Sequence, residues 1–254
     1  MNIKKHIPNA ITCGNLFCGC LAIVAAFKGN LVMSAYLVGI AAVLDFFDGF
    51  VARLLKVGGE LGKQLDSLAD MVTFGVVPGM VMFQMLAPEV QINIHDTQFI
   101  FSRSEYYQYA GFIITIFSCL RLAKFNIDTR QTNSFIGVPT PANTILICSL
   151  PLIQHFQPTA FGRNEMTILV LNNTYFLLGV TLLMSYLLVA ELPLFALKFK
   201  NFGWADNKIR YSFLIISVIL LILFQFIAIP FIIFLYIVLS IISNLTNKTK
   251  TIEH

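Results

Sequence analysis

The sequence predicts an all-α integral membrane protein, a polytopic bundle of about eight transmembrane helices with both termini in the cytoplasm. Three observations carry this prediction. The 254 residues are 57% hydrophobic and only 12% charged, whereas roughly a quarter of residues are charged in a soluble domain. Apolar runs of the roughly 20 residues that cross a bilayer recur along the whole length. Most Lys and Arg lie in alternate connecting segments.

Run length and flanking polar residues define the candidate spans. They are roughly 10–27, 31–55, 66–87, 108–125, 139–156, 166–190, 209–226 and 229–244. The last two come from one apolar run, which is too long for a single crossing at about 1.5 Å per residue. Gln225 and Pro230 lie near its middle, so we expect a tight hairpin there. No cleavage site follows the basic N-terminus, and we expect the first span to be retained.

The positive charges test this count. With the N-terminus inside, the outer segments hold only Lys28, Arg103 and Arg163 of the 17 Lys and Arg. Such a bias is typical of cytoplasmic segments. Treating the terminal run as one helix would put Lys248 and Lys250 outside, so eight crossings fit better. We therefore expect a protein of the cell (cytoplasmic or inner) membrane, with no nucleic-acid partner.

Four carboxylates lie close together in DFFDGFVARLLKVGGELGKQLDSLAD, at the cytoplasmic ends of the second and third spans. They are Asp45, Asp48, Asp66 and Asp70, from a chain with only 13 Asp and Glu. Spacings of three and four residues put each pair on one helix face, so antiparallel neighbours would aim all four at a common space. At membrane depth the four cannot all stay ionised without a counter-charge. Oxygen-only ligands favour Mg²⁺, Mn²⁺ or Ca²⁺.

Small residues and a cation share these faces. Gly49, Ala52 and Gly62 would let a ligand approach the backbone closely. Arg53 would grip a phosphate whose other oxygens rest on metal ions, a natural arrangement for displacement at a pyrophosphate. Two other interpretations are solvated acids at a loop edge and a cation-coupled transporter with an acidic relay. The transporter accounts for the carboxylates but not for the DxxDGxxAR spacing.

The segment Asp45-x-x-Asp48-Gly49-x-x-Ala52-Arg53, then eight residues, then Gly62-x-x-x-Asp66-x-x-x-Asp70 resembles the signature of the CDP-alcohol phosphotransferase family, with every fixed position present. Three further stretches resemble its phosphatidylserine synthase branch: PNAITCGNLFCGCLAI at 8–23, SCLRLAKFN at 118–126 and FIGVPTPAN at 135–143. We expect one membrane domain over residues 1–254, with a catalytic core over about 1–190 and extra helices over about 191–245.

The resemblance implies a reaction. Asp45, Asp48 and Asp66 would hold two divalent cations, Mg²⁺ or Mn²⁺, together with Asp70, which would also be the general base. CDP-diacylglycerol would lie against Gly49, Ala52, Arg53 and Gly62. The hydroxyl of L-serine would attack the phosphatidyl phosphorus, giving phosphatidylserine and CMP at a site that faces the cytoplasm. The family also suggests a homodimer.

The acceptor site is expected near Arg121 and Lys124, at the cytoplasmic end of the fourth span, followed by Asn126. One cation would hold the serine carboxylate, and Asn126 would bind the amine or hydroxyl. Ordinary positive-inside anchoring is the alternative for the two cations. Sister enzymes that act on glycerol phosphate or inositol phosphate are alternatives for the whole chain, but a phosphorylated acceptor would want additional cations in the cleft.

Overall fold

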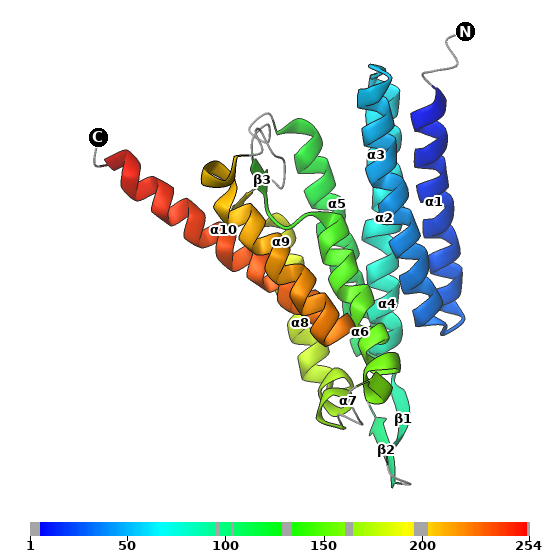
Figure 1. Ribbon diagram of the computed structural model, residues 1–254. Coiled ribbons are helices and arrows are strands. Elements are labelled where there is room, and N and C mark those ends of the chain that lie inside the picture. The colour runs from blue at the N-terminus through cyan, green and yellow to red at the C-terminus, as the bar shows by residue number, and fades with distance from the viewer. Residues whose placement is uncertain are drawn as a thin grey trace.

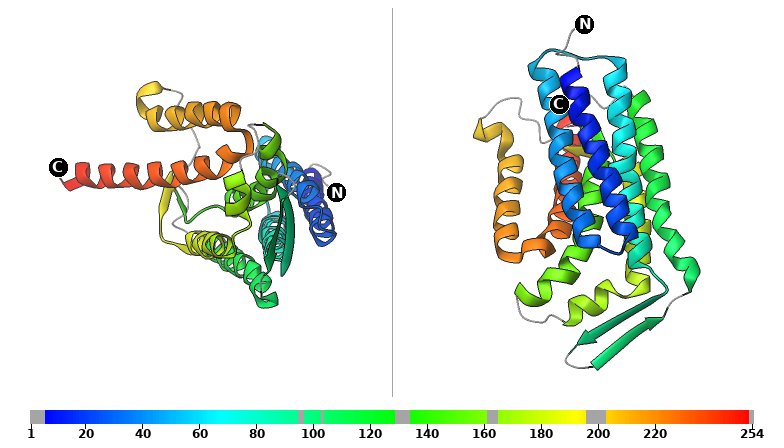
Figure 2. Two further views of the ribbon diagram at one scale, coloured as in Figure 1. Left: turned by 90° about the horizontal axis from the view of Figure 1, so that it is seen from below. Right: turned by 90° about the vertical axis from the view of Figure 1, so that its right-hand side faces the viewer.

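The computed structural model describes residues 6–94, 97–102, 104–128, 134–160, 165–195 and 203–252. The first half forms a row of long helices (Figure 1). Its elements are α1 (His6–Phe27), α2 (Leu31–Leu54), α3 (Glu60–Asp70), the π-helix η2 (Met71–Val76), α4 (Val77–Met85), the 3₁₀-helix η3 (Glu105–Gly111) and α5 (Phe112–Ile127). Helices α3, η2 and α4 continue one another as a single rod beside α1 and α2 (Figures 1 and 2). The predicted all-α membrane bundle is confirmed.

The second half packs against this row. It comprises α6 (Thr140–Ala160), α7 (Glu165–Leu171), α8 (Thr174–Val189), α9 (Trp204–Phe224), the 3₁₀-turn η4 (Gln225–Ile227) and α10 (Ala228–Ile252). Helices α9 and α10 lie on the opposite side of the bundle from α1 (Figure 2). Helix α1 begins and α10 ends at the same end of the bundle (Figure 1).

Two short antiparallel strand pairs join these helices. Strands β1 (Glu89–Ile94) and β2 (Thr97–Ser102) form a hairpin between α4 and η3, at the end of the bundle away from the start of α1 (Figure 1). Strands β3 (Ser134–Ile136) and β4 (Pro193–Phe195) pair the segment before α6 with the segment after α8. The sequence pattern did not predict either pair.

Five described stretches are long and apolar enough to cross a bilayer: His6–Phe27, Leu31–Leu54, Glu60–Met85, Glu105–Ile127 and Arg210–Ile242. The last contains the expected hairpin, because Gln225 has φ 49° and ψ −126° and ends α9. Helix α8 is apolar but shorter. The number of eight crossings is therefore still a prediction.

One predicted span is not continuous. The run 166–190 divides into α7 and α8, because the Asn173 side chain caps α8 by accepting hydrogen bonds from the backbone N–H groups of Tyr175 (2.9 Å) and Phe176 (3.1 Å). An Asn at this position satisfies N–H groups that would otherwise lack a partner and so favours a helix start. The third span also starts earlier than expected, at Glu60 instead of residue 66.

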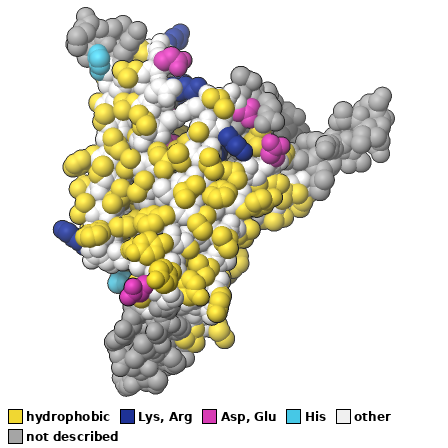
Figure 3. All heavy atoms as spheres, turned by 180° about the vertical axis from the view of Figure 1, so that it is seen from behind, with side chains coloured by type: hydrophobic (Ala, Val, Ile, Leu, Met, Phe, Trp, Pro, Cys, Tyr) yellow, Lys and Arg dark blue, Asp and Glu magenta, His cyan; other side chains and the backbone are white. Residues whose placement is uncertain are grey.

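The distribution of apolar side chains fits a lipid environment. Phe74, Met82, Ile114 and Leu177 are completely buried in the centre of the bundle. Many other large apolar side chains point outward; Ile222, for example, is 73% exposed. Hydrophobic side chains cover the middle of the face seen in Figure 3, and charged side chains lie mostly towards its ends. An apolar surface of this extent would be unfavourable in water, so it indicates contact with acyl chains.

The π-helix η2 begins directly after Asp70 and holds the rod in place against its neighbours. Its carbonyl groups accept from threonines of two neighbouring helices: Thr115 of α5 donates to Gly75 at 3.0 Å, and the Thr144 hydroxyl of α6 lies 2.8 Å from the Phe74 oxygen. Thr73 in turn donates to the Asn15 carbonyl of α1 at 3.3 Å. Such π-turns often occur at functional sites. Here, the turn connects the rod to three helices beside its acidic end.

Helix α4 crosses the junction of η3 and α5 at close range. A Cβ atom at Gly111 would lie 2.6 Å from the Phe83 nitrogen and 2.7 Å from the Gly79 oxygen, both backbone atoms. We expect Gly111→Ala to lower the free energy of unfolding in detergent by about 1–3 kcal/mol, because two backbones would have to move apart. Thermal unfolding followed by circular dichroism measures this change.

The control is Gly39→Ala in α2. A Cβ atom there has no neighbour within 4 Å. Because Ala is favoured over Gly inside a helix by roughly 0.5–1 kcal/mol, this variant should be as stable as the wild type or more stable. Equal stability of both variants would show that the Gly111 contact does not constrain the bundle.

Candidate functional site

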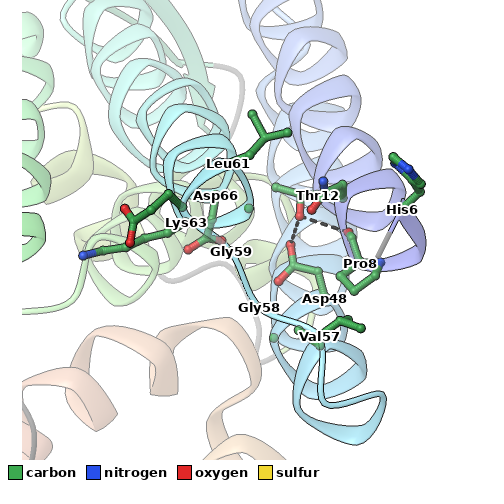
Figure 4. Close-up of a pocket in the computed structure, with 15 residues that line it drawn as sticks. His6, Pro8, Thr12, Asp48, Val57, Gly58, Gly59, Leu61, Lys63 and Asp66 are labelled. Atoms are coloured by element: carbon green, nitrogen blue, oxygen red, sulfur yellow. Dashed lines mark hydrogen bonds between the residues drawn. The ribbon is translucent and has the colours of Figure 1, made fainter. Parts of the chain in front are cut away.

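A cavity of about 640 Å³ opens between α1, α2 and α3, at the end of the bundle where α1 begins (Figures 1 and 4). Fifteen residues line it: His6, Pro8, Asn9 and Thr12 from α1, Asp48, Gly49 and Ala52 from α2, and the segments 57–63 and Asp66. The walls are thus contributed by three helices and by the loop that joins α2 to α3. This cavity contains most of the residues that the acidic signature singled out.

Three carboxylates meet beside this cavity, and Asp48 and Asp66 of the three line it. Asp45, Asp48 and Asp66 each offer an oxygen atom that lies within 4.8 Å of the others. Asp48 is buried and the other two are half-buried. The structure therefore brings α2 and α3 together through the faces that the three- and four-residue spacings predicted.

Asp70 completes the cluster one turn deeper along α3. Its carboxyl group lies within hydrogen-bonding range of that of Asp45 and within electrostatic range of Asp66. It is not part of the group of three. All four predicted aspartates are thus brought together, with Asp70 at the inner edge.

Helix α1 supports two of these carboxylates. Thr12 lies close to Asp48, and its hydroxyl donates to Oδ2 at 2.7 Å (Figure 4). Asn15, which is completely buried, donates from Nδ2 to Asp70 Oδ1 at 3.4 Å. Both contacts hold carboxylate oxygens in fixed positions. The recurrence of Asn9, Thr12 and Asn15 at intervals of three residues is the sequence signal for these partners, although helix capping or packing explains the same pattern equally well.

The carboxylate set suits a hard divalent cation. All the donor atoms that converge are oxygens, the ligands that Mg²⁺, Mn²⁺ and Ca²⁺ prefer. Close carboxylates repel one another, and partial burial makes this repulsion stronger than in water. A bound cation would offset both the mutual repulsion of the carboxylates and the cost of burying them. The residues present therefore fit a divalent metal.

Gly49, Ala52 and Gly62 leave room beside the carboxylates, and all three line the cavity. A Cβ atom at Gly62 would lie 3.3 Å from Asn9 Oδ1, so a larger residue would narrow the passage between α1 and α3. At Gly49 it would lie 3.6 Å from Arg53 Nη1. The exposed Arg53 thus lies with its guanidinium group next to the glycine that precedes it by one turn.

The three predicted acceptor residues lie in different surroundings. Arg121 is only 6% exposed and within electrostatic range of Asp70. Its Nε has no hydrogen-bond partner among the residues that the structure describes. Lys124 is exposed. The Asn126 carboxamide is paired with Ser67 of α3 at 2.8 Å, so it links α5 to α3.

Tyr236 of α10 lies near Arg121, within electrostatic range of its guanidinium group. The C-terminal helices therefore reach the inner edge of the site, a role that the sequence reasoning did not assign to them. The single Tyr in the apolar run FIIFLYIVLS is the one signal that could have pointed to it.

Comparison with known proteins identifies relatives of this site. Residues 5–184 match the sequence profile of the CDP-alcohol phosphatidyltransferase family. CDP-diacylglycerol–serine O-phosphatidyltransferase of Bacillus subtilis is 36% identical over 137 residues, 54% of this chain and 70% of that protein. The protein of the same name from Helicobacter pylori (strain J99) is 30% identical over 218 residues, 85% of this chain and 79% of the relative. Archaetidylserine synthase of Methanothermobacter thermautotrophicus is 30% identical over 160 residues, 60% of this chain and 62% of the relative.

The family match includes the acidic signature, the cavity and Arg121, and it covers well over half of the chain. The signature therefore predicted the relationship correctly, and the chain belongs to the CDP-alcohol phosphatidyltransferase family.

Proposed function

We propose that this protein transfers a phosphatidyl group from CDP-diacylglycerol to the hydroxyl of L-serine, giving phosphatidylserine and CMP. The observation that carries the proposal is the convergence of four aspartates beside a cavity large enough for a nucleotide diphosphate, in a chain whose relatives are named for this transfer. The archaeal relative is also named for a serine-containing product.

On the donor side, the four aspartates would together hold two Mg²⁺ or Mn²⁺ ions; they are Asp45, Asp48, Asp66 and Asp70. When bound, such ions withdraw charge from the diphosphate and stabilise the leaving phosphate. Arg53 lies next to Gly49, which lines the cavity, and its guanidinium group would pair with a phosphate oxygen there. Small side chains in the cavity lining would let the nucleotide approach the helix backbones closely; they are Gly49, Ala52 and Gly62.

On the acceptor side, Asp70 would be the general base. It lies deepest in the cluster, held by Asn15 and close to Arg121. The serine hydroxyl would transfer its proton to the Asp70 carboxylate as its oxygen forms a bond to the phosphatidyl phosphorus. The bond from that phosphorus to the CMP oxygen breaks, and CMP takes the electron pair. Arg121, Lys124 and Asn126 would orient the amino acid, and Asn126 would act through its contact with Ser67.

The membrane setting suits the donor. A diacyl lipid leaves the bilayer only at high cost, about 0.8 kcal/mol for each buried methylene group. Phe46, Phe47 and Phe50 form an exposed aromatic cluster on α2 close to Asp45 and Asp48. These rings would contact the acyl chains while the diphosphate enters the cavity.

The positive-charge bias supports a site that faces the cytoplasm, in the cell membrane, where serine enters and CMP leaves. We also expect a homodimer, as the family resemblance implies. The division into a core over about 1–190 and extra helices over about 191–245 is part of this proposal.

CMP release from CDP-diacylglycerol tests the reaction and the acceptor together. We expect purified protein in detergent to release CMP with L-serine but not with glycerol 3-phosphate or inositol phosphate. EDTA should abolish release, and added Mg²⁺ or Mn²⁺ should restore it. Asp66→Asn should lower the rate at least about 100-fold, because one of the three converging carboxylates is lost.

Glu105→Gln is the matched control, since Glu105 begins η3 and does not line the cavity. CMP release only with a phosphorylated acceptor would agree with the family's reaction but would show that the acceptor is not L-serine. Folded protein that releases no CMP with any acceptor would favour an ion-coupled transporter, which a flux assay in proteoliposomes would detect.

Asp70→Asn separates the base from the metal ligands. We expect kcat to fall about 10²- to 10⁴-fold, the usual contribution of a general base. Mn²⁺ binding, measured by electron paramagnetic resonance, should be weaker because one ligand is lost, but it should persist at higher Mn²⁺ concentration because Asp45, Asp48 and Asp66 remain. Full turnover of Asp70→Asn with metal bound would show that another group accepts the proton.

A further inference from the structure

A second, small cavity lies where α5 and α8 end. Its volume is about 30 Å³, room for about two water molecules or for one charged group of an amino acid. Four charged residues line it: Arg121 and Lys124 from α5, and Asp128 and Glu191, which follow the ends of α5 and α8. Because Arg121 is nine-tenths buried and its Nε lacks a partner among the described residues, the cavity contains a polar group that a ligand could satisfy.

Hydrogen bonds of the FIGVPTPAN segment hold the turn that carries Glu191. The Gly137 nitrogen donates to the Leu192 carbonyl at 2.9 Å, and the Val138 nitrogen donates to the Leu187 carbonyl at 2.9 Å. Gly137 has φ 74°, and a Cβ atom there would overlap the Leu188 carbonyl oxygen. Only glycine fits this close approach. The segment therefore fixes the backbone on both sides of Glu191.

Glu191 is exposed, and its carboxylate lies beside a helix end that also attracts positive charge. It follows the C-terminus of α8, where the unpaired carbonyl groups carry partial negative charge and favour positive side chains. Asp128 directly follows the end of α5. Two carboxylates and two helix ends thus face Arg121 and Lys124. This balance of charges matches a zwitterion, whereas a phosphorylated acceptor would meet repulsion from the acids.

We propose that Glu191 binds the α-ammonium group of the amino-acid acceptor while Arg121 binds its carboxylate. The inference rests on the proposed function and deepens it, because it names a residue that selects serine over acceptors without an amine. Since Arg121 lies near Asp70, an amino acid held this way would direct its side-chain hydroxyl towards the base. Lys124 and Asp128 complete the charged wall.

Steady-state CMP release tests this role. We expect Glu191→Gln to raise KM for L-serine about tenfold or more, because a charge-assisted hydrogen bond is lost. The value of kcat at saturating serine should stay within about threefold, since no group at the reacting atoms changes. Glu191→Asp should recover part of the loss. Glu105→Gln removes the same charge far from the cavity and should leave KM unchanged.

Glycerate, which has the hydroxyl and carboxylate of serine but no amine, gives a second readout. The wild type should prefer L-serine to glycerate strongly, and Glu191→Gln should reduce this preference about tenfold. A merely structural role would lower activity with both acceptors equally. An unchanged serine KM and preference in Glu191→Gln would overturn the inference and leave the proposed function intact. Absence of serine-dependent release in the wild type would instead overturn the proposed function itself.

Discussion

Repulsion among four carboxylates, held between α2 and α3 inside a membrane bundle, is the constraint on which the rest of the site depends. Asp45, Asp48 and Asp66 present oxygens within 4.8 Å of one another, and Asp70 lies beside them. In a medium of low dielectric constant the ionised form of this arrangement needs a compensating positive charge, and without one the carboxylates take up protons. A divalent cation held by these carboxylates would supply that charge and would also draw charge from a bound diphosphate. A bound divalent cation would thus serve both the stability of the site and its chemistry.

The surrounding fold keeps these groups from moving apart. Helix α1 contributes Thr12 and Asn15, which hydrogen-bond one carboxylate each. The π-helix that follows Asp70 is tied to α5 and α6 through Thr115 and Thr144, so α3 cannot slide along its neighbours without breaking these contacts. Preorganisation of this kind lowers the cost of binding the metal and the donor.

Much of this arrangement could be predicted from sequence because it follows from helical periodicity. The spacing of Asp45 to Asp48 and of Asp66 to Asp70 defines one face on each helix, and the short loop between them makes the helices antiparallel neighbours. The C-terminal hairpin also followed from Gln225 in a run too long for one crossing. The break at Asn173 was missed because a cap inside an apolar run looks like an ordinary polar interruption. The pairing of Asn126 with Ser67 depends on tertiary packing, which sequence patterns do not determine. The approach of Tyr236 to Arg121 also depends on packing, and the lone Tyr of the last apolar run was its one signal.

Direct binding of a divalent cation tests this account most closely, because it does not depend on which acceptor is used. Purified protein in detergent would be titrated with Mn²⁺, and free Mn²⁺ would be followed by electron paramagnetic resonance. The account predicts saturable binding that Mg²⁺ displaces, weakened at least about tenfold in Asp48→Asn and unchanged in Glu105→Gln. Equal Mn²⁺ binding by wild type and Asp48→Asn would contradict it, because the carboxylates would then have to be stabilised by something other than a metal.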